Sequence, residues 1–407
     1  MFLEDPVQVK NPVQAKKKSD FEGPKHRGPL RRIFITFVMV LAWALKPFKF
    51  LRPIMPVRLR ELVKTWDSEM IWTFILSGNK RFFGDQNAKL LDPPSFKPLI
   101  KTRPEWQFTE DQIRQFYKNG FIGPITVWTP EEMDEIKGTV ANVLESKSKV
   151  YPNVKNYLRD RYIDRPDFWE VISSPRLTER LAQILGPDLL VWRSQIFNKN
   201  PGDPEITWHQ ATTYMIEQLI KPTLEPKDLS QLFQLTTWIA VDDAYPENGC
   251  MYFLKGTQRK VWTYSPHPNG LPADTPEIAK RIAGNGQFGE ASGALLDIDI
   301  TEDMIVPMPL KAGQAVIFTE RCVHGSPPNT SPNRRFGFVF RTIKPDVKVY
   351  RDEDIHAVGY MNESYDLSNW GCALLRGEDK YGLNKLIQPP SYDREFVDAS
   401  GAVAAKA

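Results

Sequence analysis

Arg335-Phe-Gly-Phe-Val-Phe-Arg-Thr-Ile343 is the stretch of sequence that says most about the fold. Aromatic residues alternate with other residue types along it, and this alternation is typical of a β-strand with two different faces. Other strand-like runs, bounded by Gly, Pro, Asn or Asp, lie at 189–197, 234–241, 249–254 and 314–319. The sequence therefore predicts that the second half of the chain is built from short strands.

Helical signals precede these strands. Thr109-Glu-Asp-Gln112 and Thr129-Pro-Glu-Glu132 each combine an N-cap threonine with Gln or Glu three residues later, which is the pattern of a helix start. We expect helices from 109 to 117, from 129 to about 147 and from 174 to 185, with a short strand at 121–127. Helices followed by strands predict an α+β, mainly β fold, in which helices cover an antiparallel sandwich or barrel.

Composition narrows the class of protein. The 407 residues are 41% hydrophobic and 25% charged, which fits a globular protein and excludes collagen and a polytopic membrane protein. The length suggests two or three domains, or one large domain with extensions. The three cysteines include no CxxC pair, so a disulfide framework and a paired-thiolate zinc site are excluded, and a reducing compartment is favoured.

Positive charge is concentrated at the N-terminus. Residues 1–64 contain 14 Lys and Arg against 5 Asp and Glu, whereas the whole chain carries a net charge of only +3. The remainder of the chain is therefore acidic. Nucleic-acid binding by the main domain is not expected.

The N-terminal region predicts a membrane-associated protein inside the cell. Residues 1–32 have the composition of a disordered basic arm. Ile33–Leu45 is an uncharged run between basic residues, and it is shorter than the roughly 20 apolar residues that span a bilayer. We expect 33–64 to associate with a membrane, with contact through residues 33–52 as an interfacial anchor. The alternatives are a short or tilted span, a buried helix packed on the main domain, and a signal sequence.

The rest of the chain divides into three further parts. Residues 65–104 are expected to form a connecting helical or irregular segment, and 105–345 the main domain. Within it, 262–312 contains Pro, Asn-Gly and Gly-Asn-Gly and predicts a long insertion or lid. Residues 346–407 are expected to be a C-terminal extension.

Two of the five histidines are candidates for chemistry. His209 and His324 both lie at strand ends in polar, turn-rich contexts, and Arg335 follows His324 by eleven residues. Histidines on distant strands of one barrel can meet inside it and bind iron. An arginine one strand away can hold a carboxylate with two parallel hydrogen bonds. The ordinary alternatives are a hydrogen-bonded structural role for each histidine and a surface charge for Arg335.

With these residues, the chain resembles the phytanoyl-CoA dioxygenase-like branch of the iron(II)/2-oxoglutarate oxygenases. The similarity covers about 105–345, with one departure at Lys255-Gly-Thr-Gln258, where relatives have Pro-Gly-Ser-His. It implies a double-stranded β-helix (jelly-roll, cupin-like) core with flanking helices, preceded here by the apolar basic extension. The matching stretches, in the family's order, are Phe108–Phe121, Phe197–Gly202, Trp208–Gln210, Trp238–Asp243, Glu247–Cys250 and His324–Ser326 with Arg335.

The resemblance also implies roles for individual residues. His209 and His324 would be iron ligands, and Arg335 would bind the distal carboxylate of 2-oxoglutarate. Trp238, Gln195 and Ser326 fall where the family contacts this cosubstrate. The implied cofactors are Fe(II), 2-oxoglutarate and O2.

One departure bears on the reaction. The family's iron-binding triplet is His-x-Asp, whereas this chain has His209-Gln210-Ala211, and alanine cannot bind a metal. A radical halogenase is similar to these oxygenases, except that the ligating carboxylate is replaced by Ala or Gly and chloride takes the vacated position on iron. Fe(II) itself supplies the positive charge that a halide needs. The sequence thus predicts a halogenase that chlorinates an unactivated aliphatic carbon, with Ala211 as the halide-permitting position.

Three other interpretations stay open. The protein could be a hydroxylase that uses water or a remote carboxylate, such as Glu217, as the third ligand. It could be a catalytically inactive binding protein of the same fold, or a hydroxylase whose carboxylate was removed by engineering. The retention of both histidines, Arg335 and Trp238 argues against an inactive protein.

The substrate is expected to be a small molecule. The apolar, basic leader and the aromatic-rich composition favour a lipid-like substrate delivered from a bilayer. The alternative is that the leader only sets the location of the protein. The sequence has no Gly-rich phosphate loop that would indicate a coenzyme A thioester. A free amino acid or alkaloid is the alternative substrate.

Overall fold

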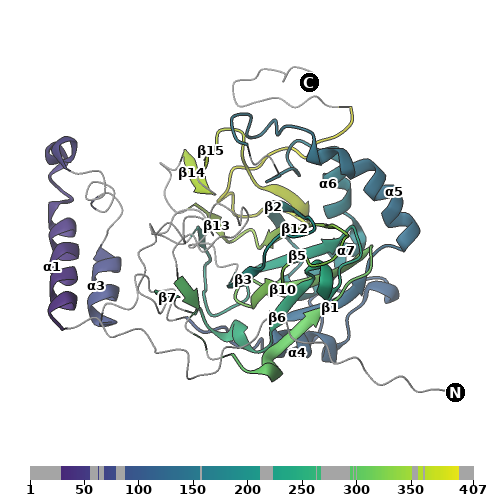
Figure 1. Ribbon diagram of the computed structural model, residues 1–407, viewed down its shortest axis with the longest axis horizontal. Helices are drawn as coiled ribbons and strands as arrows, with labels where there is room; N and C mark the ends of the chain where they lie inside the picture. The colour runs from purple at the N-terminus through teal and green to yellow at the C-terminus, as the bar shows by residue number, and fades with distance from the viewer. Residues whose placement is uncertain are drawn as a thin grey trace.

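The computed structural model describes residues 29–55, 63, 68–78, 88–155, 158–210, 223–262, 264–266, 294–296, 298, 300–350, 356–360 and 363–393. Two antiparallel sheets form the body of the molecule (Figure 1). The larger has the order β1-β10-β5-β12-β2-β16, with bounds Phe121–Thr126, Gln314–Thr319, Gln234–Ala240, Arg335–Ile343, Leu189–Lys199 and Ala373–Arg376. The smaller has the order β3-β11-β6-β9, with bounds Ile206–His209, Val323–Ser326, Met251–Leu254 and Ile305–Met308.

Three two-stranded ladders complete the strands of the described ranges. They pair β4 with β13 (Leu224–Glu225, Lys348–Val349), β7 with β8 (Tyr264–Pro266, Ala294–Leu296) and β14 with β15 (Ala357–Tyr360, Glu363–Asp366). The mixed α/β architecture with antiparallel sheets confirms the cupin-like part of the expected fold. The jelly-roll winding stays a prediction.

Strand β12 explains how the two sides of the larger sheet differ. Its phenylalanines, Phe336, Phe338 and Phe340, belong to the core on the helical side, where Phe338 meets Phe168 edge to face with ring centroids 5.2 Å apart. The alternate residues Val339 and Arg341, like Arg335 at the start of the strand, line a cavity on the other side. The alternation seen in the sequence therefore separates a structural face from a chemical one.

Gly337 lies on the cavity side of β12 and leaves room for a large neighbour. A Cβ atom at this position would lie 2.6 Å from Cζ2 of Trp238 and 2.7 Å from the carbonyl oxygen of Ile239. Real Cβ atoms do not approach other heavy atoms so closely. Glycine is therefore what allows the Trp238 ring to pack against the strand.

The three helices that the sequence predicts begin within one residue of the expected positions. Thr109 and Thr129 both form complete capping boxes, at the start of α4 and α5. Helix α5 ends at Val140 rather than near 147, because Gly138, Thr139 and Val140 are poor helix formers and the chain continues as a 3-10 turn. The helices of the main domain are η4 Pro104–Trp106, α4 Glu110–Asn119, α5 Pro130–Val140, η5 Ala141–Leu144, α6 Pro166–Ile172, α7 Pro175–Leu185, η6 Pro246–Asn248, η7 Thr257–Arg259 and η8 Glu302–Met304.

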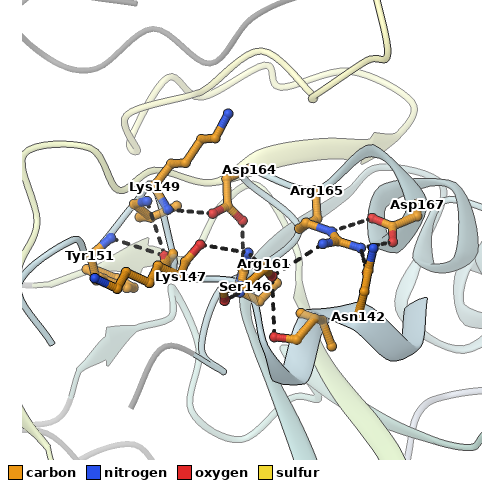
Figure 2. Close-up of polar contacts among 12 residues, drawn as sticks. Asn142, Ser146, Lys147, Lys149, Tyr151, Arg161, Asp164, Arg165 and Asp167 are labelled. Carbon is orange, nitrogen blue, oxygen red and sulfur yellow. Dashed lines mark hydrogen bonds and ion pairs between the residues drawn. The ribbon is translucent and has the colours of Figure 1, made fainter. Parts of the chain in front are cut away.

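Two arginines hold the loop between η5 and α6 (Figure 2). Nε of Arg161 donates to Asp164 at 2.9 Å, and its Nη1 donates to the carbonyl oxygen of Ser146 at 2.9 Å. Nε of Arg165 donates to Asp167 at 2.8 Å, and its Nη2 reaches Asn142 at 2.6 Å. These bonds satisfy the polar groups of a loop that has little regular structure.

The N-terminal helices stand beside the main body (Figure 1). They are α1 (Pro29–Leu45), η2 (Lys49–Ile54) and α3 (Ser68–Leu76). Helix α1 includes the last four residues of the predicted basic arm, 29–32, and residues 1–28 lie outside the described ranges. Among the described residues, no helix combines the length and hydropathy needed to cross a membrane.

Two strands of the main sheets lie inside segments that were expected to be an insertion and a C-terminal extension. Strand β9 falls inside the predicted insertion 262–312 but pairs with β6, and β16 falls inside the predicted C-terminal extension but pairs with β2. Both strands therefore belong to the main sheets. Local sequence did not reveal this, because a short edge strand is recognised by its partner rather than by its own pattern. Most of 262–312 lies outside the described residues.

Candidate active site

His209 and His324 face each other across the smaller sheet. They are register partners on the antiparallel strands β3 and β11, and their ring centroids lie 4.2 Å apart. The structure thus brings together two residues separated by more than a hundred positions in the sequence. Two imidazoles at this distance can both reach one metal ion.

The ring of His324 is held in one orientation. Its Nδ1 lies 2.8 Å from the carbonyl oxygen of Cys322, and because a carbonyl can only accept, Nδ1 must carry the proton. This leaves the lone pair of Nε2 to face the cavity. Burial, together with His209 nearby, holds the pKa of His324 well below its usual value. The neutral imidazole that a metal requires is therefore the favoured form.

A small cavity of about 40 Å³ lies between the two sheets next to these histidines. Its walls combine apolar side chains with two arginines, a threonine and a serine. Among the described residues, no third His, Cys, Asp or Glu joins the two histidines in a metal-binding group. The lining residues are Phe197, Ile206, His209, Thr236, Trp238, Met251, Phe318, His324, Gly325, Ser326, Arg335, Val339 and Arg341.

Arg335 is a buried cation at one end of this cavity. It is 1% exposed, its Nη1 donates to the carbonyl oxygen of Gly249, and its guanidinium lies 5.4 Å from the centre of the Trp238 ring. In the described part of the chain no carboxylate pairs with it, and its Nε has no hydrogen-bond partner. Burial lowers the pKa of Arg335 to about 10. An anionic ligand would supply the charge partner that this buried group needs.

Lys199 lies beside Arg335, and the sequence did not single it out. The two residues are register partners on β2 and β12, and Nζ of Lys199 donates to Oγ of Ser326 at 2.8 Å. Burial, with Arg335 as the next cause, lowers the pKa of Lys199 to about 7. The Arg335 guanidinium, the Lys199 amine and the Ser326 hydroxyl therefore lie close together beside the cavity, which suits a carboxylate.

A second polar pair lies further along the same wall. Arg341 and Thr236 are register partners on β12 and β5, and both line the cavity. Thr236 is in turn the register partner of Phe318, whose ring centroid lies 4.7 Å from that of His324. The sequence held a signal for Arg341, because it follows Arg335 by six residues and an even spacing on a strand puts both side chains on one face.

Only some of the remaining predicted site residues line the cavity. Trp238 and Ser326 line the cavity, whereas Gln195 does not. Gln195 is the register partner of Val339, which does line it, so Gln195 lies one strand further out on the same wall. Ala211 and Glu217 lie outside the described residues.

Comparison with known proteins identifies the family of the chain. A family model described as phytanoyl-CoA dioxygenase (PhyH) matches residues 116–337. Phytanoyl-CoA dioxygenase domain-containing protein 1 of Danio rerio is 27% identical over 192 residues, which are 46% of this chain and 57% of the relative. Ectoine dioxygenase of Nocardia farcinica is 24% identical over 249 residues, which are 58% of this chain and 78% of the relative. The chain spans somewhat more than half the length of the Danio relative.

Solved structures extend the comparison to the fold. The structure "CytC3 with Fe(II) and alpha-ketoglutarate" superimposes with a TM-score of 0.54 and 26% identity, covering 69% of this chain and 93% of that one. An apo structure of the non-heme monooxygenase ThoJ superimposes with a TM-score of 0.50 and 22% identity, covering 69% and 88%. Since the family model matches more than half of the sequence, the chain belongs to the phytanoyl-CoA dioxygenase (PhyH) family of Fe(II)/2-oxoglutarate oxygenases.

Proposed function

We propose that this oxygenase is a radical halogenase that replaces a C–H bond of a small molecule by C–Cl. The observation that carries the proposal is the pair of facing histidines without a carboxylate: position 211 is alanine, and no acidic residue joins the histidines in the described part of the chain. Two neutral imidazoles fit Fe(II), for which imidazole is an ordinary ligand. A halide would then take the place of the missing carboxylate.

The proposed reaction needs Fe(II), 2-oxoglutarate and O2, together with chloride. Fe(II), 2-oxoglutarate and O2 together supply, when bound, the oxidation that turns a C–H bond, chloride and a proton into C–Cl and water, while 2-oxoglutarate becomes succinate and CO2. His209 and His324 hold the metal in this scheme. Arg335 binds the distal carboxylate of 2-oxoglutarate, with Trp238 and Ser326 beside it and Gln195 further out.

The cavity wall near the histidines suits a halide. Arg341 offers a permanent positive charge and Thr236 a hydroxyl donor, and both line the space that His209 and His324 share. An anion is stabilised by such groups in addition to the metal charge. The rest of that wall, including Phe318 and Val339, is apolar. These side chains would limit the access of water to the halide.

The halide site can be tested before any substrate is known. Anaerobic titration of the Fe(II)–2-oxoglutarate complex with chloride or bromide should change its visible absorption. Ala211→Asp should abolish that change, because the new carboxylate occupies the halide position, and Ala211→Gly should preserve it. A response to halide that is the same in Ala211→Asp and in the parent protein would contradict the proposed role of Ala211.

Two other functions remain as outcomes of the same test. If the parent protein ignores halide but oxidises substrate, it is a hydroxylase with water or Glu217 as third ligand. If it binds neither iron nor 2-oxoglutarate, it is an inactive binding protein of the family.

We further propose that the enzyme works on an intracellular membrane surface with a lipid-like substrate. This is supported by apolar side chains on α1 that are exposed to solvent: Leu30 is 82% exposed, Ile33 66%, Phe34 65% and Phe37 62%. Residues 29–55 contain five basic residues and no acidic one, which suits an anionic lipid surface. All three cysteines, Cys250, Cys322 and Cys372, are free and buried, in keeping with a reducing compartment.

Vesicle sedimentation tests this location. The parent protein should pellet with phosphatidylserine-containing vesicles and less with neutral ones. Replacing Phe34 and Phe37 by Ser should weaken binding at least tenfold, since burying each ring contributes about 1.5–3 kcal/mol. A matched pair at another exposed site, Tyr381→Ser with Leu383→Ser, should have no effect. Parent protein that stays in the supernatant would show that α1 has another role.

A further inference from the structure

Gln210, the residue after His209, is almost completely buried and fully hydrogen-bonded. It is 1% exposed, and its Nε2 donates to the carbonyl oxygens of Lys260 at 2.9 Å and Arg321 at 2.5 Å. Its Oε1 accepts from the backbone N–H of Trp262 at 2.8 Å. One side chain thus ties the end of β3 to two segments that are distant in sequence.

The two bonded segments bear directly on the histidines. Arg321 lies three residues before His324, and the next carbonyl in the chain, that of Cys322, is the one that orients the His324 ring. A shift of the Arg321–Cys322 backbone would therefore turn that ring. Because Gln210 directly follows His209, its hydrogen bond to Arg321 holds this backbone at a fixed position relative to His209.

The strand ladder alone gives the two histidines little support. The β3–β11 pairing consists of His209 with His324 and Ile206 with Ser326, with a register irregularity between them. Strand β3 ends at His209, and in the described part of the chain no ladder pair follows it. The side chain of Gln210 continues the cross-strand bonding where the backbone ladder stops.

We propose that Gln210 is a positioning residue that sets the separation of His209 and His324 for metal binding. This inference rests on the proposed two-histidine iron centre but is independent of whether the product is chlorinated or hydroxylated. Removing a group that orients a metal ligand typically lowers the affinity for the metal 10- to 100-fold. We expect Gln210→Leu, which keeps the size and loses all three bonds, to weaken Fe(II) binding by about that factor.

The chain offers a closely matched control in Gln183. This buried glutamine donates from Nε2 to the carbonyl oxygens of Trp106 at 3.0 Å and Glu179 at 3.1 Å. Its Oε1 accepts from the backbone N–H of Phe108 and from Nε2 of Gln107, both at 2.7 Å, so it makes one side-chain bond more than Gln210. It lies on α7, on the helical side of the larger sheet. Gln183→Leu should lower the melting temperature about as much as Gln210→Leu, yet leave Fe(II) affinity within about twofold of the parent.

The measurement is anaerobic Fe(II) titration of the parent and of Gln210→Leu, Gln210→Glu and Gln183→Leu, with folding checked by circular dichroism. Gln210→Glu keeps the acceptor for Trp262 but loses both donors, so it should bind Fe(II) as weakly as Gln210→Leu. Any of three results would overturn the proposal. They are parent-like Fe(II) affinity in both Gln210 variants, an equal loss of Fe(II) affinity in Gln183→Leu, and failure of both Gln210 variants to fold. A parent protein that binds no Fe(II), or that binds it unchanged after His209→Ala, would instead overturn the iron centre of the proposed function.

Discussion

His209 and His324 are direct partners across an antiparallel ladder, with ring centroids 4.2 Å apart, although 114 residues separate them along the chain. The pairing of β3 with β11 is therefore what creates a candidate metal site. If both imidazoles bind the iron, His209→Ala and His324→Ala should each abolish Fe(II)-dependent conversion of 2-oxoglutarate to succinate. His356→Ala, at an exposed position remote in sequence from both, is the control and should be fully active. Retained turnover in either ligand variant would contradict the assignment.

Arg335 should determine affinity for 2-oxoglutarate. Arg335→Lys keeps the charge but loses the paired N–H groups that match a carboxylate. Losing a hydrogen bond to a charged group costs about 1.5–3 kcal/mol, so KM for 2-oxoglutarate should rise about ten- to a hundredfold with a smaller effect on kcat. Arg334→Lys is the matched control, because Arg334 points to Asp242 and is partly exposed. An unchanged KM in Arg335→Lys would transfer the role to Lys199 or Arg341.

Lys199 should make the binding of 2-oxoglutarate dependent on pH. Its pKa of about 7 in the folded protein is below the value of 10.5 for an ordinary lysine, so the folded, ligand-free protein releases this proton as the pH rises through 7. A carboxylate held by Arg335 favours the protonated amine, and binding then takes up a proton. The Kd for 2-oxoglutarate should therefore rise above pH 7 by up to about tenfold per pH unit.

Calorimetry in buffers of different ionisation enthalpy measures this proton uptake. Lys199→Met should bind 2-oxoglutarate more weakly at pH 7 and show no uptake. A pH-independent Kd in the parent protein would show that Lys199 does not contribute to binding of 2-oxoglutarate.

Gly337 should be intolerant of even a methyl group. Gly337→Ala forces a Cβ atom to within 2.6 Å of the Trp238 ring, and overpacking of this kind typically costs about 1–3 kcal/mol. Because Trp238 lines the cavity, 2-oxoglutarate binding should weaken as well. Gly138→Ala is the control: its Cβ meets nothing within 4 Å, on a helix where alanine is favoured. Equal melting temperatures for Gly337→Ala and Gly138→Ala would rule out the packing argument.

Local signals in the sequence predicted much of the fold. Thr109 and Thr129 start helices because their side chains cap the exposed N–H groups of the first turn, a relationship confined to four residues. The alternation along 335–343 predicts a strand with two different faces, and it too is a relationship between residues that are close in sequence. Such features need no knowledge of distant parts of the chain.

The assembly of the site depends on register, which local sequence does not contain. Lys199 lies beside Arg335 and Ser326 only because β2 pairs with β12 in this register. Thr236 reaches the histidines through two further pairings, with Arg341 and Phe318. The contribution of Gln210 was equally hidden, since its three partners lie 50 or more residues away.

Product analysis tests the proposal of halogenation most directly. The parent protein, loaded with Fe(II) and supplied with 2-oxoglutarate, O2 and chloride, is incubated with cell extract, and products are examined by mass spectrometry for paired chlorine isotopes. The account predicts a chlorinated product that becomes brominated when bromide replaces chloride and that disappears in Ala211→Asp. If the protein converts its own substrate to hydroxylated product alone at saturating chloride and bromide, the proposal of halogenation is contradicted. The protein is then a hydroxylase of this family.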